Sequence, residues 1–371
     1  MAADLEAKSR WARRPGTIDE TLLSSSSMVH DRDAMGGLAP GKFVGRYRVL
    51  GRVGVGDRGV VYAARDPQLD RKVALRLLRP HPGNEESTEQ AVARVAEEAK
   101  LLAEISHPNL ISILDIGTHH GIVFVALEFI EGRPLREWMD QGELPHPWPE
   151  VLLRFRGVGR GLAAAHRAGF VHRDFRPEKV LVDAEGSARI ADLGLARPRA
   201  NTIDAEASSA TRRLRPEDDT SVESLTSPLI RTGRWIGTPA YMAPEQYAGA
   251  RIDAQADQFA FCVALYEALY GERPFAGRTV QAVMLAIEEG RVRPPSKARR
   301  VPAWLRKIVV RGLAHDPESR WPDMDVLLDA IDRRSASAGL GAALEAARSL
   351  GAQLRRRMRA PKVQPSAGQD P

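Results

Sequence analysis

Residues 170–182 read FVHRDFRPEKVLV, and residues 190–194 follow with IADLG. Asp174 and Asp192 stand in these two segments, and Arg176 and Lys179 lie between them. A carboxylate can accept a proton or hold a metal ion, whereas a positioned cation stabilises negative charge on a phosphate group. These segments are therefore the best starting point for the fold and the chemistry of the chain.

Several further segments precede this stretch in a fixed order. Residues 54–61 read GVGDRGVV, and such glycines let backbone amides approach phosphates without obstruction by side chains. Residues 73–76 read VALR, residues 94–105 read RVAEEAKLLAEI with the pattern of a helix, and residues 127–130 read LEFI. The glycine segment alone is a weak signal, and the order of all the segments is the stronger evidence for the class of fold.

Three more features follow the opening stretch. Residues 237–245 read GTPAYMAPE, and Asp257 lies twelve residues further on, at the start of an apolar run. Residues 315–321 read HDPESRW and contain Arg320. The segments occur in order over most of the chain. A chance match to one short motif therefore does not explain them.

In this order the segments resemble the bacterial (Hanks-type) serine/threonine protein kinase family, with degenerate catalytic motifs, from about Tyr47 to Ile331. The resemblance implies an α+β, two-lobed fold with a small β-rich N-lobe, one C-helix and a larger helical C-lobe. It implies ATP and Mg²⁺ or Mn²⁺ as cofactors, and a protein substrate or signalling partner.

The resemblance also implies a role for each matching residue. Asp174 corresponds to the base that accepts the substrate hydroxyl's proton, Asp192 to the Mg²⁺ ligand, and Glu98 to the C-helix glutamate that pairs with residue 76. The nucleotide is expected against Gly54, Gly56, Gly59, Val61, Ala74, Arg76, Glu128, Ile130 and Leu181. Structural or regulatory positions are expected at His172, Arg173, Thr238, Glu245, Asp257 and Arg320, and a spine linking the lobes at His172, Leu193 and Leu102. Among them, the resemblance implies that Asp257 braces the catalytic loop and that Arg320 pairs with Glu245.

Three of the catalytic positions depart from the family pattern. Arg76 replaces the phosphate-binding lysine, Arg176 replaces the lysine that meets the transferred phosphate, and Lys179 replaces an asparagine that holds one Mg²⁺. A guanidinium is planar and bulkier than an ammonium, so Arg76 can keep a pair with Glu98 while misplacing phosphates. An ammonium at Lys179 repels a metal ion, so binding of one ion only, or weakened binding, is expected.

These departures leave three functional hypotheses open. The first is a protein of the kinase fold with impaired or lost phosphotransfer, a pseudokinase that binds nucleotide and acts through partners. The second is an active serine/threonine kinase with Asp174 as base and Arg176 on the transferred phosphoryl group. The third is a scaffold that binds no nucleotide.

The predicted organisation has three parts. Residues 1–43 are polar and expected to be disordered, residues 44–332 form the kinase-like domain, and residues 333–371 form a basic tail. Within the domain we expect the N-lobe at 44–127, the hinge at 128–132, the C-lobe at 133–332 and a polar activation-segment insert at 198–231. Arg173 is the type of residue that binds a phosphate group on such a segment. The candidate phosphorylation sites in the insert and just beyond it are Thr220, Ser224, Thr226, Ser227 and Thr232.

Composition restricts the class of protein. The formal charge of +6 lies in residues 333–371, which hold eight Lys/Arg against Glu345 and Asp370, so a nucleic-acid-binding domain is not expected. The longest apolar run, residues 259–270, is too short to cross a membrane, and Cys262 within it is the one cysteine. A cytoplasmic location and a buried, structural thiol are predicted.

The basic tail has a helical spacing of leucines from Leu340 to Leu354, followed by the cluster RRRMR at residues 355–359. Gly339, Gly341 and Gly351 weaken that helix. Two interpretations stay open: a solvated tail or a helix packed on the C-lobe, and a peripheral contact with an anionic membrane or a partner.

Overall fold

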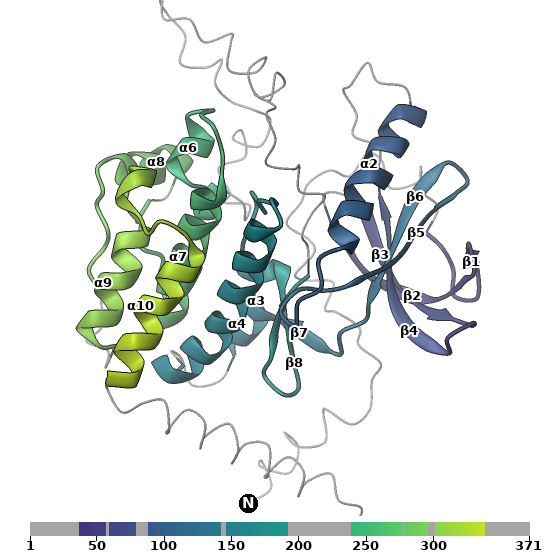
Figure 1. The fold of residues 1–371 in the computed structure, drawn as a ribbon, viewed down its shortest axis with the longest axis horizontal. Coiled ribbons are helices and arrows are strands. Elements are labelled where there is room, and N and C mark those ends of the chain that lie inside the picture. The colour runs from purple at the N-terminus through teal and green to yellow at the C-terminus, as the bar shows by residue number, and fades with distance from the viewer. Residues whose placement is uncertain are drawn as a thin grey trace, which may run out of the picture.

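The computed structural model describes residues 37–56, 59–78, 88–141, 146–191, 239–277, 279–295 and 301–337. They form two lobes, a β-rich N-lobe and a helical C-lobe, which lie side by side in Figure 1. The two-lobed α+β fold predicted from the sequence is thereby confirmed.

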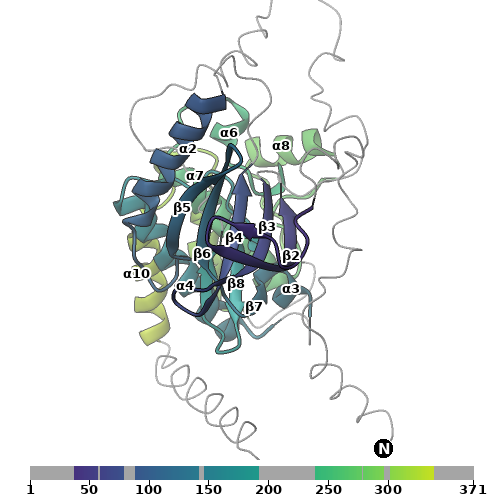
Figure 2. The same ribbon diagram turned by 90° about the vertical axis from the view of Figure 1, so that its right-hand side faces the viewer.

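The N-lobe is a six-stranded antiparallel sheet with one helix on it. The order is β1-β2-β3-β4-β6-β5. The strands are β1 (Phe43–Val44), β2 (Tyr47–Gly56), β3 (Gly59–Asp66), β4 (Arg71–Leu78), β5 (Ile113–His119) and β6 (Ile122–Glu128). Helix α2 (Thr88–Ala103) packs on β5 and β6, and Figure 2 shows it along one edge of the sheet.

The period of two in β3 separates two faces of this sheet. Val60, Tyr62 and Ala64 are buried in the N-lobe core, while Val61 and Ala63 between them are only half-buried. Alternation of this kind is typical of a strand that packs on a core with one face only. The second face is the one that carries the candidate site.

The C-lobe consists of a small sheet and a helical core. The sheet has the order β7-β8-β9, from β7 (Gly132–Pro134), β8 (Val180–Asp183) and β9 (Ala188–Ile190). The α-helices are α3 (Leu135–Asp140), α4 (Trp148–Arg167), α6 (Pro244–Tyr247), α7 (Ala254–Tyr270), α8 (Val280–Glu288), α9 (Ala303–Gly312) and α10 (Met324–Ser337). Short 3-10 turns are η2 (Pro177–Lys179), η4 (Pro239–Tyr241) and η5 (Pro317–Ser319).

Helix α7 is the centre of the C-lobe because it is apolar on all sides, and nearly all its residues are buried. Asp253 caps its start by accepting a bond from the backbone amide of Gln255 at 2.8 Å, and Gly271, with φ of +70°, ends it. Burial raises the pKa of the Cys262 thiol to about 12, which makes it an inert core group.

Several contacts join the lobes around the start of β5. Leu102 of α2 packs with Ala165 and Phe170 of the C-lobe, so the predicted spine position of Leu102 does link the lobes. Asn109 donates from Nδ2 to the carbonyl of Ala188 at 2.8 Å, and the backbone amide of Ile190 donates to the carbonyl of Asn109 at 2.9 Å. These contacts hold α2 and β5 against the segment that leads to Asp192.

Parts of the predicted organisation lie outside the described residues. They include residues 1–36, the insert at 198–231 with its candidate phosphorylation sites, and the tail from 338. Helix α10 runs to Ser337, so the predicted domain end at 332 falls inside a helix. In the described ranges, no helix combines the length and apolar content needed to span a membrane.

Gly59 gives a testable point of strain in the N-lobe. It has φ of +144°, and a Cβ added there would clash with the carbonyl oxygen of Leu77 on β4. We expect Gly59→Ala to cost on the order of 1–3 kcal/mol of unfolding free energy, measured by urea denaturation. Gly51→Ala in β2 is the matched control, because a Cβ there meets no atom within 4 Å. An equal cost in both variants would contradict this explanation.

Candidate active site

The upper wall of the site is the half-buried face of β3 and β4. Cross-strand register places Val61 opposite Arg76, and Arg76 opposite Val125. Ala74 lies two residues along the same face and opposite Leu127. Val61, Ala74 and Arg76 are each half-buried, so small apolar groups and one cation share this wall.

The predicted glycine loop joins β2 to β3 at the edge of this wall. Gly54 pairs with Val61 and Gly56 with Gly59 in the strand register. A Cβ on Gly54 would meet no atom within 4 Å, in contrast to Gly59, so the fold itself has room for a side chain at position 54. Gly54 is therefore a position where a side chain would affect an approaching ligand and not the packing of the lobe.

The hinge follows β6. Glu128 ends this strand, and its carboxylate forms an ion pair with Arg189 of β9. Lys72 lies over the ring of Phe129 at 3.8 Å and within 4.0 Å of Glu131, so its ammonium contacts the hinge and does not replace the missing lysine at position 76. Ile130 is half-buried in the hinge.

The lower wall is β8, which follows the catalytic segment directly. Leu181 is half-buried and pairs in register with Pro134 of β7 and Arg189 of β9. The amide of Ala191 donates to the carbonyl of Lys179 at 2.7 Å, which holds the start of the segment containing Asp192 beside η2. The apolar groups expected to contact an adenine ring thus come from both lobes.

Asp257 holds the catalytic segment from below. Its carboxylate accepts bonds from the backbone amides of His172 at 2.6 Å and Arg173 at 2.7 Å, and His166 Nε2 lies 2.8 Å from it. Arg173 has φ of +63°, a strained conformation for an arginine that these bonds hold in place. The bracing position assigned to Asp257 from the sequence corresponds to this geometry, whereas His166 was not foreseen.

The acid–base state of Asp257 follows from these bonds. Burial alone would raise the pKa of Asp257, but the hydrogen bond and charge of His166, the charge of His172 and its backbone amide outweigh burial and hold the pKa below its usual value. Asp257 therefore stabilises the folded protein. This contribution is complete above about pH 3.9, the pKa of the aspartate in the unfolded chain, and it is lost as pH falls through the lower pKa of Asp257 in the folded protein.

This linkage gives a prediction on pH dependence. Between about pH 5 and pH 2.5 the urea midpoint of the wild type should fall more than that of Asp257→Asn, because the asparagine binds no proton in either state. Other carboxylates titrate equally in both proteins and cancel in the difference. Parallel midpoint curves over this range would show that Asp257 does not have the depressed pKa.

Asp174, the expected base, is held between two cations. Lys179 Nζ forms an ion pair with Asp174 Oδ2, and Arg176 Nε lies 3.9 Å from Oδ1. The Lys179 side chain is 10% exposed and that of Asp174 23% exposed, so the pair is largely withdrawn from water. The resemblance assigned Lys179 to a metal-binding position, and the contact that the structure describes for it is with Asp174.

Four predicted site groups lie beyond what the structure describes. Asp192, Leu193 and Thr238 fall in the range 192–238, and the side chain of Glu98 in α2 is not described. Glu98 does lie within the helix expected for it. Its pairing with Arg76 and the metal-binding role of Asp192 stay predictions.

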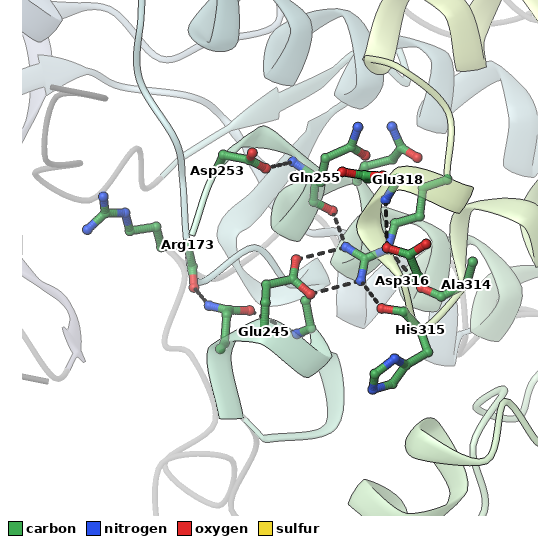
Figure 3. Close-up of polar contacts among 12 residues, drawn as sticks. Arg173, Glu245, Asp253, Gln255, Ala314, His315, Asp316 and Glu318 are labelled. Atoms are coloured by element: carbon green, nitrogen blue, oxygen red, sulfur yellow. Dashed lines mark hydrogen bonds and ion pairs between the residues drawn. The ribbon is translucent and has the colours of Figure 1, made fainter. Parts of the chain in front are cut away.

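The segment that closes the site is fixed by the predicted pair of Glu245 and Arg320. Arg320 Nη1 and Nη2 donate to the two carboxylate oxygens of Glu245, each at 2.8 Å, and the Arg320 side chain is fully buried. The same guanidinium also donates to three backbone carbonyls, those of Ala314, Gln255 and His315 (Figure 3). A buried arginine with all of these acceptors is a rigid anchor.

Gln246 connects this anchor to the catalytic segment. Its Nε2 donates to the carbonyl of Arg173 at 2.7 Å, and its Oε1 accepts from the amide of Ala243 at 2.9 Å. Figure 3 shows the Arg173 carbonyl directed toward the helix that carries Glu245. A glutamine after the PE dipeptide was the available signal, but nothing in its spacing indicated its partner.

A second polar cluster, which the sequence analysis did not predict, links η4 to α7. Arg136 of α3 contacts Tyr241 and donates to Glu267 at 2.8 Å, while the Tyr241 hydroxyl donates to Glu267 at 2.5 Å. Arg136 also reaches Glu178 of η2 at 3.1 Å. Burial raises the pKa of Tyr241; burial would also raise the pKa of Glu267, but Arg136 outweighs it and lowers that pKa. The cluster keeps Tyr241 neutral and Glu267 charged.

The two-lobed fold, with a glycine loop above and a braced HRD segment below, defines the protein kinase class. Residues 47–329 match the family described as the protein kinase domain. The chain belongs to the protein kinase family, and its relatives are bacterial serine/threonine kinases of Hanks type.

Two relatives illustrate the extent of the match. The probable serine/threonine-protein kinase PknB of Lactococcus lactis is 30% identical over 302 residues, which are 79% of this chain and 43% of that protein. Serine/threonine-protein kinase PknL of Mycobacterium tuberculosis is 32% identical over 280 residues, 75% of this chain and 63% of that protein. The chain thus spans only part of the length of these relatives.

Among solved structures, the PknI kinase domain of Mycobacterium tuberculosis is similar in fold. Its TM-score is 0.56 at 24% identity, and the match covers 80% of this chain and 99% of that one. At 24% identity, this similarity is evidence for a shared fold only.

Proposed function

We propose that this chain binds ATP between its lobes and transfers phosphate slowly or not at all, so that it acts as a pseudokinase in signalling through protein partners. The observation that carries the proposal is the ion pair between Lys179 and Asp174, with Arg176 on the other carboxylate oxygen. The cytoplasmic location inferred from the lone cysteine remains a prediction.

The ion pair acts on the step in which a base takes the proton of the substrate hydroxyl. A general base must reach that hydroxyl by a direct hydrogen bond, about 2.6–3.2 Å between heavy atoms. In this chain an ammonium occupies one oxygen of Asp174 and a guanidinium lies near the other. The substrate hydroxyl therefore has to compete with internal cations for its acceptor.

The residues present fit ATP better than they fit two metal ions. Val61, Ala74 and Leu181 supply apolar walls, and Gly54 leaves the loop open for phosphates. An ammonium cannot ligate Mg²⁺, because all its hydrogen-bonding atoms are donors. Lys179 at the position of the metal-binding asparagine thus removes one ligand, and Asp192 is the residue that would hold a remaining ion. When bound, that ion supplies positive charge to the phosphates.

The alternative is an active serine/threonine kinase with unusual metal use. It is favoured by the braced segment at Asp257 and by the buried pair of Glu245 and Arg320, which keep the catalytic and substrate-binding segments in place. In that case Asp174 is the base, and Arg176 meets the transferred phosphate. A scaffold that binds no nucleotide is the third candidate.

Thermal unfolding in the presence of ATP separates the third candidate from the other two. At an ATP concentration of 100 times the Kd, binding stabilises the folded protein by about 2.7 kcal/mol. We expect ATP to raise the unfolding temperature in the presence of EDTA, with little further increase on adding Mg²⁺. The reason is that Lys179 supplies the positive charge that a second metal ion supplies in the family. Lys179→Asn should make the stabilisation depend on Mg²⁺.

Gly54→Ala provides the matched variant for this assay. It should leave the unfolding temperature of the free protein unchanged, because the added Cβ meets no atom within 4 Å, while reducing the ATP-induced rise. Absence of an ATP effect in the wild type under all conditions would favour the nucleotide-free scaffold. An effect that requires Mg²⁺ would contradict metal-independent binding.

A further inference from the structure

A hollow of about 310 Å³ lies between α9 and α10. Figure 1 shows these two helices on the side of the C-lobe away from the N-lobe sheet. It is lined by Trp304, Lys307, Ile308, Trp321, Ala330, Arg333 and Arg334. None of these residues takes part in the candidate active site. We call it the α9–α10 hollow.

The aromatic walls of the hollow are fixed in place. The indole Nε1 of Trp321 donates to the carbonyl of Ile308 at 3.1 Å, and its backbone amide donates to Gln258 at 3.0 Å. Arg311 lies over the Trp321 ring at 4.1 Å. Trp304 packs edge-on against Trp148, with ring centroids 6.0 Å apart. The hollow therefore exists before any ligand arrives, which lowers the ordering cost of binding.

The rim of the hollow is positively charged. Lys307, Arg333 and Arg334 are all exposed, and Arg333 is paired with Asp329 at 3.5 Å, with both side chains well over half exposed. An exposed pair of that kind is weak. Within the part of the chain that the structure describes, no ion pair is formed by Lys307 or Arg334. Their charge is thus available to an acidic partner.

We propose that the α9–α10 hollow binds an acidic segment of a partner protein, which inserts one aromatic or large aliphatic side chain between the tryptophans. The hollow is at the small end of ligand pockets, of a size for one such side chain, and aromatic groups pack well against indoles. Carboxylates beside the inserted side chain then meet Lys307, Arg333 and Arg334.

The basic part of the C-terminal tail, residues 348–362, is a poor occupant of the hollow on grounds of charge. Residues 338–371 begin directly after α10 but carry six Lys/Arg against Glu345 and Asp370. All six of these cations lie within residues 348–362, and that part of the tail is repelled by the basic rim. Charge complementarity therefore favours an acidic segment of a partner protein. This inference does not depend on the function proposed for the cleft between the lobes.

The test uses the full chain and an array of acidic heptapeptides with Phe, Tyr, Trp or Leu at the centre, each with an alanine-centred counterpart. Fluorescence anisotropy of labelled peptides gives the Kd. We expect at least one peptide to bind about 10-fold or more tightly than its alanine counterpart, because the buried anchor dominates such contacts. Lys307→Glu with Arg334→Glu should weaken that binding by about 10-fold or more.

Two further variants keep the result interpretable. Ala330→Phe fills the hollow and should abolish binding, with its fold checked by the urea midpoint. Lys42→Glu with Arg251→Glu changes the net charge equally at exposed positions elsewhere and should leave the Kd within about 2-fold. The proposal is overturned if no peptide exceeds its alanine counterpart, if the control pair weakens binding as much as the rim pair, or if laurate binds the hollow and the peptides do not.

Discussion

Arg76→Lys combined with Lys179→Asn is expected to raise the rate of phosphate transfer from ATP/Mg²⁺ by on the order of 10²- to 10⁴-fold. Each change restores one positioned group, and the loss of one such electrostatic contact typically costs about 10²- to 10³-fold. The two effects are not additive, because the groups act in one site. Lys179→Asn also frees the Asp174 carboxylate from its internal ammonium.

The measurement is a single-turnover assay with labelled ATP and a generic serine/threonine substrate. Asp174→Asn in the double variant should remove the gain, because the restored activity needs the base. Arg176→Lys alone is the matched control and should raise the rate much less than the double variant, because Arg176 already places a positive charge where the transferred phosphoryl group is expected. If the double variant is no faster than the wild type, the charge substitutions are not the cause of impaired transfer.

The second large effect is expected at Arg320. Arg320→Ala should lower the free energy of unfolding by about 3–5 kcal/mol, because it leaves the buried carboxylate of Glu245 without its partner. Three backbone carbonyls also lose their donors. The guanidinium joins α6, α7 and the segment before η5, so its removal affects the whole C-lobe and not one helix.

Urea denaturation of the two proteins measures this cost. Lys100→Ala is the matched control, since its pair with Glu97 is exposed and should be worth less than about 1 kcal/mol. Similar losses in both variants would indicate a general effect of removing cations. A loss below about 1 kcal/mol for Arg320→Ala would contradict the anchoring role.

The fold and several pairs were predictable because the ordered motifs of the chain resemble those of one family. The period-two burial in β3 and the burial of α7 on all sides agree with that fold. The pair of Glu245 and Arg320 could be named because both residues stand in recognisable motifs, GTPAYMAPE and HDPESRW. The bracing aspartate Asp257 was found in the same way.

Other contacts depend on tertiary geometry that no spacing reveals. The ion pair of Lys179 with Asp174, five residues back along the chain, was not foreseen, and the expected effect of Lys179 on a metal ion at Asp192 stays a prediction. His166 on Asp257 and Arg136 on Glu267 join residues from separate helices, and neither histidine nor arginine stands in a distinctive motif. The α9–α10 hollow likewise arises from side chains of two helices and the turn between them.

The most direct test of the account is the Asp174-dependent rate of phosphate transfer by the wild-type chain. Folded protein is assayed with ATP/Mg²⁺ and with ATP/Mn²⁺ by mass spectrometry, on itself and on a generic substrate, with Asp174→Asn as the background. The account predicts a rate of about 10⁻² per second or less above that background, at least about 100-fold below the lower end of the range of about 1–100 per second for kinases. An Asp174-dependent rate within that range would contradict it and establish an active kinase that works with Lys179 and Arg76 in place.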